Sequence, residues 1–215
     1  MKSISGSMFN IQYNVLDDNE LNLFEECVES VGDSFYAPAG ENNKTSRYTT
    51  TSAEKNVYAY SITTTVPKGY SVMIQKHPDL EVLLNKIIRP TCNALHIVSL
   101  RMRETGVIPL HQDDSINEHI ESQLYILPDL VSVYYINVPH DIEGGVLRLV
   151  GGEDVQSVKP KTNMLVQFAG DTWHECTKIV KSSTVRRMFV VEQYALSRRN
   201  LRKMSGYDTP KLLKG

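Results

Sequence analysis

Short apolar segments separated by turn-forming residues fill the sequence from residue 93 onward, and they limit the chain to few folds. Each is rich in β-branched, aromatic and aliphatic residues, a composition typical of strands. Turn signals such as Glu143-Gly144-Gly145 and Lys159-Pro160-Lys161 separate them. The predicted strands cover residues 94–103, 107–111, 123–127, 130–138, 145–150, 163–168, 174–180 and 184–193. About eight strands at this spacing predict a mainly β fold, either a sandwich or a barrel, with the double-sheet jelly roll as one option.

Two amphipathic helices are predicted before these strands. The first begins at Asp18 and runs to about residue 31, because its apolar residues recur at three- and four-residue steps. The second opens at Pro78 and ends before Pro90. Each helix has one apolar face, so both are expected to pack on the outside of one sheet.

The other segments give weaker signals. Residues 8–15 alternate enough for a short strand, and residues 33–56 are polar and predict a loop or lid. Residues 57–74 favour one or two strands broken at Pro67-Lys68-Gly69. The end of the chain, from residue 196, predicts a basic helical turn and a frayed tail.

The length of 215 residues suits a single domain. Within it, residues 1–92 are expected to form a mixed helical support, residues 93–195 the β core, and residues 196–215 a terminal helix and tail. The domain is expected to resemble a jelly roll with flanking helices.

Charge and cysteine content point to an ordinary soluble chain. The net charge is −2, so no global positive field is present to attract nucleic acid. Cys27, Cys92 and Cys176 are odd in number and far apart, which favours reduced thiols over a disulfide scaffold or zinc ribbon. No apolar leader or membrane-spanning segment is visible, and the expected location is the cytoplasm.

The pair His111-x-Asp113, followed by His174, is the candidate metal site. Residues two apart on a strand face the same side, so His111 and Asp113 can reach one ion. Two imidazoles and one carboxylate form the facial triad that binds non-haem Fe(II) and leaves coordination positions open. Such a pair also arises by chance, with the histidines as surface or core residues. A further alternative is that Asp114, and not Asp113, supplies the carboxylate ligand.

A set of motifs around these residues resembles the Fe(II)/2-oxoglutarate-dependent dioxygenases, in their prolyl-4-hydroxylase-like branch. Their order and approximate spacing match that superfamily over about residues 94–195, whereas the first 90 residues match nothing in it. The matching segments are His111-x-Asp113, Tyr134-Tyr135-Ile136-Asn137, Gly144-Gly145-Val146-Leu147-Arg148-Leu149, Asp171-Thr172-Trp173-His174 and Thr184-Val185-Arg186. The resemblance implies a cupin-like double-stranded β-helix core with flanking helices.

The resemblance also implies a cofactor set. His111, Asp113 and His174 would bind Fe(II), with 2-oxoglutarate as co-substrate, O₂ as oxidant and ascorbate as an auxiliary reductant. An arginine on the last core strand would pair with the distal carboxylate of 2-oxoglutarate. Arg186 and Arg187 both qualify, and the Thr-x-Arg pattern favours Arg186.

The hydroxyl of Tyr135 would bind the same carboxylate. One tyrosine of the Tyr134-Tyr135 pair is expected to be an ordinary strand aromatic.

Two arginines and one loop are weaker candidates for contacts with the substrate. Arg101 and Arg103 share one side of the strand that leads to His111, and either could bind a substrate carboxylate or phosphate if that side faces the pocket. The alternative is that both face solvent at a sheet edge. The loop at 114–122 follows the metal motif and could cover the substrate.

The expected function is therefore hydroxylation of a C–H bond in a small molecule or amino-acid side chain, with release of succinate and CO₂. Two alternatives stay open at this point. One is demethylation of a nucleic-acid base, against which the acidic charge balance and Glu192 argue, because demethylases of the superfamily carry a second arginine there. The other is a jelly-roll binding protein without turnover.

Overall fold

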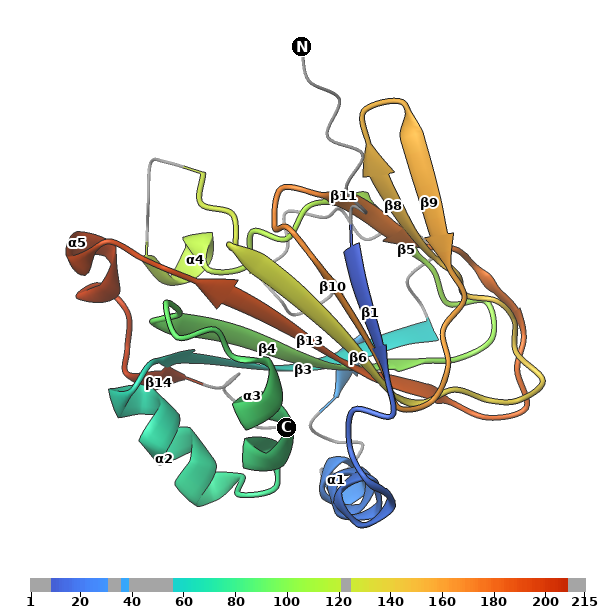
Figure 1. Ribbon diagram of the computed structural model, residues 1–215, viewed down its shortest axis with the longest axis horizontal. Helices are drawn as coiled ribbons and strands as arrows, with labels where there is room; N and C mark the ends of the chain where they lie inside the picture. The colour runs from blue at the N-terminus through green and yellow to red at the C-terminus, as the bar shows by residue number, and fades with distance from the viewer. Residues whose placement is uncertain (1–8, 31–35, 39–55, 121–124, 209–215) are drawn as a thin grey trace.

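The computed structural model describes residues 9–30, 36–38, 56–120 and 125–208. A large antiparallel sheet of eight strands dominates it (Figure 1), in the order β1-β10-β6-β13-β4-β3-β14, with β2 also paired to β3. The bounds of these strands are β1 Phe9–Tyr13, β2 Ala37–Pro38, β3 Val57–Thr65, β4 Ala94–Met102, β6 Leu130–Asn137, β10 Met164–Phe168, β13 Arg186–Tyr194 and β14 Tyr207–Asp208.

A four-stranded antiparallel sheet in the order β5-β11-β8-β9 faces the large sheet, and β7 pairs with β12 beside it. Their bounds are β5 Ile108–His111, β7 Glu143–Gly144, β8 Leu147–Gly151, β9 Asp154–Val158, β11 Trp173–Cys176 and β12 Ile179–Lys181. The helices are α1 Asp18–Ser30, α2 Lys68–Lys76, α3 Leu80–Ile87, α4 Asn117–Ile120 and α5 Arg198–Leu201. Figure 1 shows α1, α2 and α3 against one face of the large sheet, with the small sheet on the other.

The alternation of side chains along each strand produces two separate cores. On the helix side, Phe24 of α1 packs edge-to-face against Tyr134 and Phe189, with ring centroids 5.9 and 5.4 Å apart. Between the sheets, Tyr135 and Met188 pack with residues of the small sheet. Adjacent residues of one strand thus enter different cores, and only the core between the sheets can include the candidate ligands.

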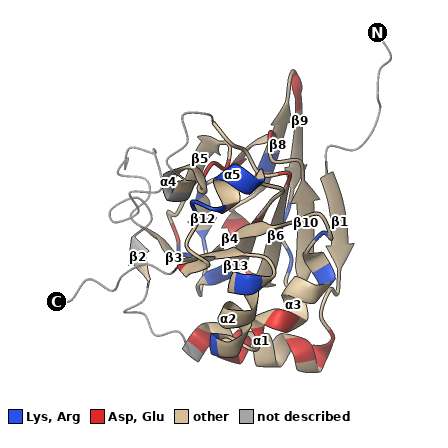
Figure 2. Ribbon diagram, turned by 90° about the vertical axis from the view of Figure 1, so that its left-hand side faces the viewer, with Lys and Arg blue, Asp and Glu red and all other residues tan. Residues whose placement is uncertain are grey.

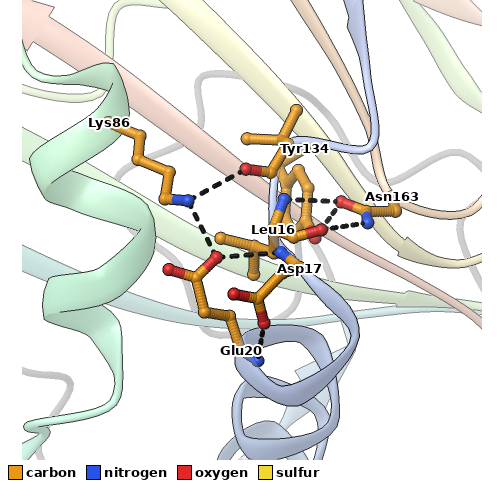
Figure 3. A network of polar contacts seen from close by, with 7 residues as sticks. Leu16, Asp17, Glu20, Lys86, Tyr134 and Asn163 are labelled. Carbon is orange, nitrogen blue, oxygen red and sulfur yellow. Dashed lines mark hydrogen bonds and ion pairs between the residues drawn. The ribbon is translucent and has the colours of Figure 1, made fainter.

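A polar network fixes the start of α1 to the large sheet (Figure 3). The amide oxygen of Asn163 accepts hydrogen bonds from the Leu16 backbone N–H and the Tyr134 hydroxyl, both at 3.0 Å. Its amide nitrogen donates to the Leu16 carbonyl at 2.7 Å. Asp17 and Glu20 cap the helix reciprocally, each accepting from the other's backbone N–H at 2.9 Å.

Charged side chains are concentrated on the outside of the molecule. Figure 2 shows acidic residues along α1 and α3, the helices on the outer face of the large sheet. Arg186 and Glu192 on β13 are exceptions, because both are buried, and so are Asp113 and Asp114 after β5. In the described part of the chain, no helix is both long and apolar enough to cross a membrane.

The mainly β prediction with flanking helices is confirmed, but several segments differ. The second part of residues 57–74 forms α2 rather than a strand. Residues 125–127, the described part of the strand predicted at 123–127, are irregular. The predicted strand at 174–180 is divided into β11 and β12, and β9 and β14 were not predicted. Most of the loop predicted at 33–56 lies outside the described residues.

The first 92 residues contribute strands to the large sheet as well as helices. Strand β1 pairs along its length with β10, and β3 pairs with β4 over nine residues, Val57 to Thr65. Both are therefore structural strands of the large sheet, and the sheet continues across the predicted subdivision at residue 92.

Candidate metal centre

The small sheet brings His111 and His174 together. His111 is the last residue of β5 and pairs in register with His174 of β11. Asp113 follows His111 by two positions, after the strand has ended. One ligand atom from each of the three side chains lies within 4.8 Å of the others. Among the described residues, no other cluster of this kind offers three potential metal ligands.

Backbone carbonyls orient both imidazoles. The Nδ1 atom of His111 lies 2.7 Å from the carbonyl oxygen of Pro109, and Nδ1 of His174 lies 3.1 Å from that of Thr172. Each Nδ1–H can donate to its carbonyl, which leaves Nε2 as the unprotonated nitrogen. The two Nε2 atoms lie 3.4 and 3.6 Å from the carboxylate oxygens of Asp113. Both rings thus present their lone pairs to the space that Asp113 faces.

One oxygen of the Asp113 carboxylate lacks the hydrogen-bond partner that burial requires. This atom, Oδ2, is buried without a hydrogen bond, which is costly for a charged group. Although burial acts to raise the pKa of Asp113, the positive charge of the two histidines lowers it overall. The site therefore favours a positive charge among the three side chains, and a divalent cation supplies one without protonating either histidine.

The electrostatics of the two histidines differ. Burial acts to lower the pKa of His111, but its hydrogen bond to Asp113 and the charge of Asp113 raise the pKa overall. Burial lowers the pKa of His174, and the charge of Asp113 offsets only part of this effect. The alternative carboxylate, Asp114, is buried but does not belong to the converging group.

A buried guanidinium lies further along the same space between the sheets. Arg186 is 0% exposed at the start of β13, and its Nη1 donates to the Gly145 carbonyl at 2.5 Å. Its Nη2 faces two sulfur atoms, Sδ of Met102 at 2.7 Å and Sγ of Cys176 at 2.9 Å. Its Nε has no partner, and no carboxylate in the described part of the chain pairs with it. A buried charge of this kind is strongly destabilised without an anion.

Tyr135 and Arg187 lie as the strand alternation requires. The ring of Tyr135 faces Arg186, with the guanidinium carbon 5.8 Å from the ring centroid, whereas Tyr134 packs on the helix side. Burial raises the pKa of the Tyr135 hydroxyl, which therefore keeps its proton. Arg187 lies on the opposite face, where its Nη1 forms an ion pair with Glu29 of α1 at 2.6 Å.

The overall fold is shared with known enzymes. The chain is similar to a prolyl-4-hydroxylase from Pseudomonas putida, at 14% identity over 90% of this chain and 96% of that one, with a TM-score of 0.56. It is also similar to a prolyl hydroxylase from Trichoplax adhaerens, solved with a hypoxia inducible factor peptide fragment, at 15% identity over 90% and 86% of the chains and a TM-score of 0.59. The chain has the 2-oxoglutarate and Fe(II) oxygenase fold.

A third structure with this oxygenase fold comes from Burkholderia pseudomallei and is an oxidoreductase of the 2OG-Fe(II) oxygenase family. It has 12% identity over 93% of this chain and 96% of that one, with a TM-score of 0.55. No family model and no curated protein sequence matches the chain. The jelly-roll prediction is confirmed by these structural similarities, which at such identities concern the fold.

The structure does not bring Arg101 and Arg103 to the metal side of the oxygenase fold. Met102, between them on the chain, faces Arg186 in the space between the sheets, so its two neighbours point away from that space, and Arg103 is exposed with its guanidinium over the ring of Tyr58. Accordingly, Arg101 donates to the Val28 carbonyl of α1 at 3.2 Å. The expectation that this side faces the pocket is wrong, because alternation along a strand does not reveal which face is internal.

Several residues of the site were not singled out from the sequence. Gly145 was assigned to a turn, but a β-carbon there would lie 2.8 Å from Nη1 of Arg186. Gln112 donates to the Asp171 carbonyl at 2.6 Å and links the two segments that carry ligands. Ser115, two positions after Asp113, donates a partly buried hydrogen bond to Glu192. For Gly145 the sequence offers only the turn signal of two glycines, and for Glu192 only the presence of a polar residue inside an apolar strand. It offers no signal for Gln112 or Ser115.

Proposed function

We propose that the protein is an Fe(II)- and 2-oxoglutarate-dependent oxygenase that hydroxylates a C–H bond, with release of succinate and CO₂. The observation that carries the proposal is the convergence of His111, Asp113 and His174 within 4.8 Å. Two imidazoles and one carboxylate form the ligand set of non-haem Fe(II) oxygenases. When bound there, Fe(II) would supply dioxygen activation and the oxidative decarboxylation of the co-substrate.

The surroundings of Arg186 support 2-oxoglutarate as the co-substrate. A planar guanidinium binds a carboxylate through two parallel hydrogen bonds, and here it is buried without an acidic partner among the described residues. Cys176, which contacts Arg186, is two positions after His174 on β11. Residues two apart on a strand are about 7 Å from each other, a span that a five-carbon dicarboxylate can bridge.

In this proposal the keto acid end of 2-oxoglutarate lies at the metal, and its distal carboxylate replaces the sulfur atoms as the partner of Arg186. Tyr135, whose ring centroid lies 5.8 Å from the guanidinium carbon of Arg186, would donate its hydroxyl hydrogen to the same carboxylate. The apolar residues between the sheets exclude water from this region and strengthen the charge pairing.

The substrate class we propose is an amino-acid side chain, presented by a peptide or as a small molecule. Support comes from the similar structures, two of which are prolyl hydroxylases, one of them solved with a peptide fragment. A dipeptide or peptide panel that contains proline is therefore the first substrate set to test.

The function is tested by turnover of the co-substrate. Metal-free protein is loaded with Fe(II), mixed with 2-oxoglutarate and oxygen, and assayed for succinate with and without the peptide panel. We expect slow succinate formation that a productive peptide accelerates, and none in Asp113→Ala. Equal succinate formation by wild type and Asp113→Ala would contradict the proposal. Arg187→Gln is the matched control, because it changes an arginine of the same strand outside the pocket.

A further inference from the structure

Glu192 lies beneath the candidate metal centre, although it is not one of the converging ligands. It is 1% exposed and follows Arg186 by six positions on β13, so both face the space between the sheets. In the large sheet, Glu192 pairs in register with Val131, and Val131 pairs with Phe168. The ring centroid of Phe168 is 4.8 Å from that of His174. Glu192, Val131 and Phe168 thus lie side by side across three strands, and Phe168 packs against the proposed metal ligand His174.

The carboxyl of Glu192 binds the segment that follows Asp113. It accepts a hydrogen bond from Ser115 Oγ at 2.7 Å and another from the Tyr194 hydroxyl. Ile116, the next residue, is fully buried in a cluster that includes Tyr194. The chain immediately after the carboxylate ligand is thus fixed to β13 by one hydrogen bond and one apolar contact.

The position of the Asp113 side chain depends on this backbone. Its Oδ2 atom accepts no hydrogen bond, so no direct hydrogen bond holds that oxygen in place. On the other side of Asp113, Gln112 donates to the Asp171 carbonyl at 2.6 Å, in the turn that precedes His174. The two flanking hydrogen bonds, from Gln112 and from Ser115, therefore fix the chain on either side of Asp113 and help to place its carboxylate beside the two imidazoles.

We propose that Glu192 is a positioning residue of the metal centre, which fixes the carboxylate ligand Asp113 through its hydrogen bond to Ser115. This inference rests on the metal site proposed above. Partners that orient a metal ligand typically change metal affinity by about 10- to 100-fold when they are removed. Glu192 acts through hydrogen-bond geometry, so a neutral acceptor of the same shape retains most of the effect.

The test measures Co(II) binding to the full-length, metal-free protein. Calorimetry gives the affinity, and the visible spectrum of the bound ion reports its coordination. We expect Glu192→Ala and Ser115→Ala to weaken Co(II) binding by about tenfold or more and to change the spectrum. Glu192→Gln should stay within about threefold of wild type, because its amide oxygen can accept from Ser115. If Glu192→Ala does not fold, Ser115→Ala removes the same hydrogen bond from a partly exposed loop residue.

Gln193→Ala is the matched control. Gln193 is buried on the same strand but faces the helices, where its Nε2 donates to the Ile87 carbonyl at 3.0 Å. We expect this variant to lose stability and keep the wild-type Co(II) affinity.

Three outcomes would overturn the proposal in different ways. If wild type binds no Co(II), the metal site itself fails. If wild type binds and Ser115→Ala has the same affinity and spectrum, only the positioning role of Glu192 fails. If Glu192→Gln binds as weakly as Glu192→Ala, the charge of Glu192, and not its hydrogen bond to Ser115, controls the site.

Discussion

Arg186 and Arg187 are adjacent in β13, yet their guanidinium groups lie on opposite faces of the large sheet. Arg186 is buried between the sheets, where Nη1 donates to the Gly145 carbonyl. Arg187 reaches α1 and pairs with Glu29 at 2.6 Å, with a side chain that is 24% exposed. One dipeptide thus supplies a candidate anion-binding group to the core and an ion pair to the helix layer.

The two arginines provide a matched pair of variants. Arg186→Gln should weaken 2-oxoglutarate binding by at least about 30-fold, because losing one partner of a buried charge pair costs about 2 kcal/mol or more. Arg187→Gln should leave that affinity unchanged and lower stability by less than about 1 kcal/mol, since its ion pair is partly solvated. Calorimetric titration of the metal-loaded proteins measures both. An equal loss of 2-oxoglutarate affinity in the two variants would mean that Arg186 does not bind the co-substrate.

Gly145 is expected to be essential for the position of Arg186. Its φ is +63°, and a β-carbon would lie 2.8 Å from Nη1 of Arg186 and 3.0 Å from Cγ1 of Ile179. Gly152 has a similar φ of +65° with nothing within 4 Å, so it is the control for backbone strain alone.

Gly152→Ala should therefore cost about 1 kcal/mol of stability and leave 2-oxoglutarate binding intact. Gly145→Ala should cost more and also weaken 2-oxoglutarate binding. Denaturant unfolding and calorimetry separate the two effects. Similar behaviour of both variants would show that Arg186 can move away from Gly145 without loss.

Asn163 should contribute to stability without affecting the metal centre. Its side chain makes three buried hydrogen bonds, two to the backbone of Leu16 and one to the hydroxyl of Tyr134. Asn163→Ala leaves these groups unpaired and should lower the free energy of unfolding by roughly 3 kcal/mol. Because α1 packs on the far side of the large sheet, Co(II) affinity should not change. A loss of metal affinity in the folded variant would reveal coupling between the two cores.

Glu192 should make the metal-free protein less stable as the pH rises. Burial, followed by the negative charge of Asp113, raises the pKa of Glu192 well above its ordinary value. In the unfolded chain the carboxyl ionises above about pH 4.3, whereas in the folded protein it keeps its proton to a higher pH. Unfolding then releases a proton, so the free energy of unfolding falls as the pH rises above about 4.3.

Glu192→Gln removes this dependence. Above about pH 4.3, where the unfolded carboxyl ionises, the stability of the variant relative to wild type should therefore rise with pH. Denaturant unfolding in the presence of a chelator measures the difference. A constant difference across this range would show that Glu192 is ionised in the folded protein.

The candidate ligands could be predicted because local sequence determines their positions. His111 and Asp113 are two residues apart at the end of a strand, and the turn at Gly170-Asp171-Thr172 starts the strand that carries His174. The strands themselves follow from their apolar composition. Strand β9 was not predicted because it is an edge strand in which only Val158 is buried, so its sequence carries no regular apolar alternation.

Other features depend on contacts between distant segments. The alternation of Arg101 and Arg103 follows from the sequence, but only contacts in the folded chain, such as that of Arg101 with the Val28 carbonyl of α1, show which face is internal. The hydrogen bond between Ser115 and Glu192 joins residues 77 positions apart, and no local pattern indicates it. Residues 68–76 are rich in apolar and β-branched residues, yet they pack as a helix beside β3 and β14. Tertiary packing overrides local preference there.

The most direct test of the central claim is an anaerobic titration of 2-oxoglutarate into the protein with and without Fe(II). Chelation of Fe(II) by a 2-oxo acid produces a visible charge-transfer absorption, which reports binding at the metal. We expect this absorption to saturate with a single 2-oxoglutarate per chain, and to be absent without Fe(II) and in Asp113→Ala. Wild-type protein that gives no such absorption, or Asp113→Ala protein that gives the same absorption, would contradict the assignment of His111, Asp113 and His174 as an oxygenase iron site.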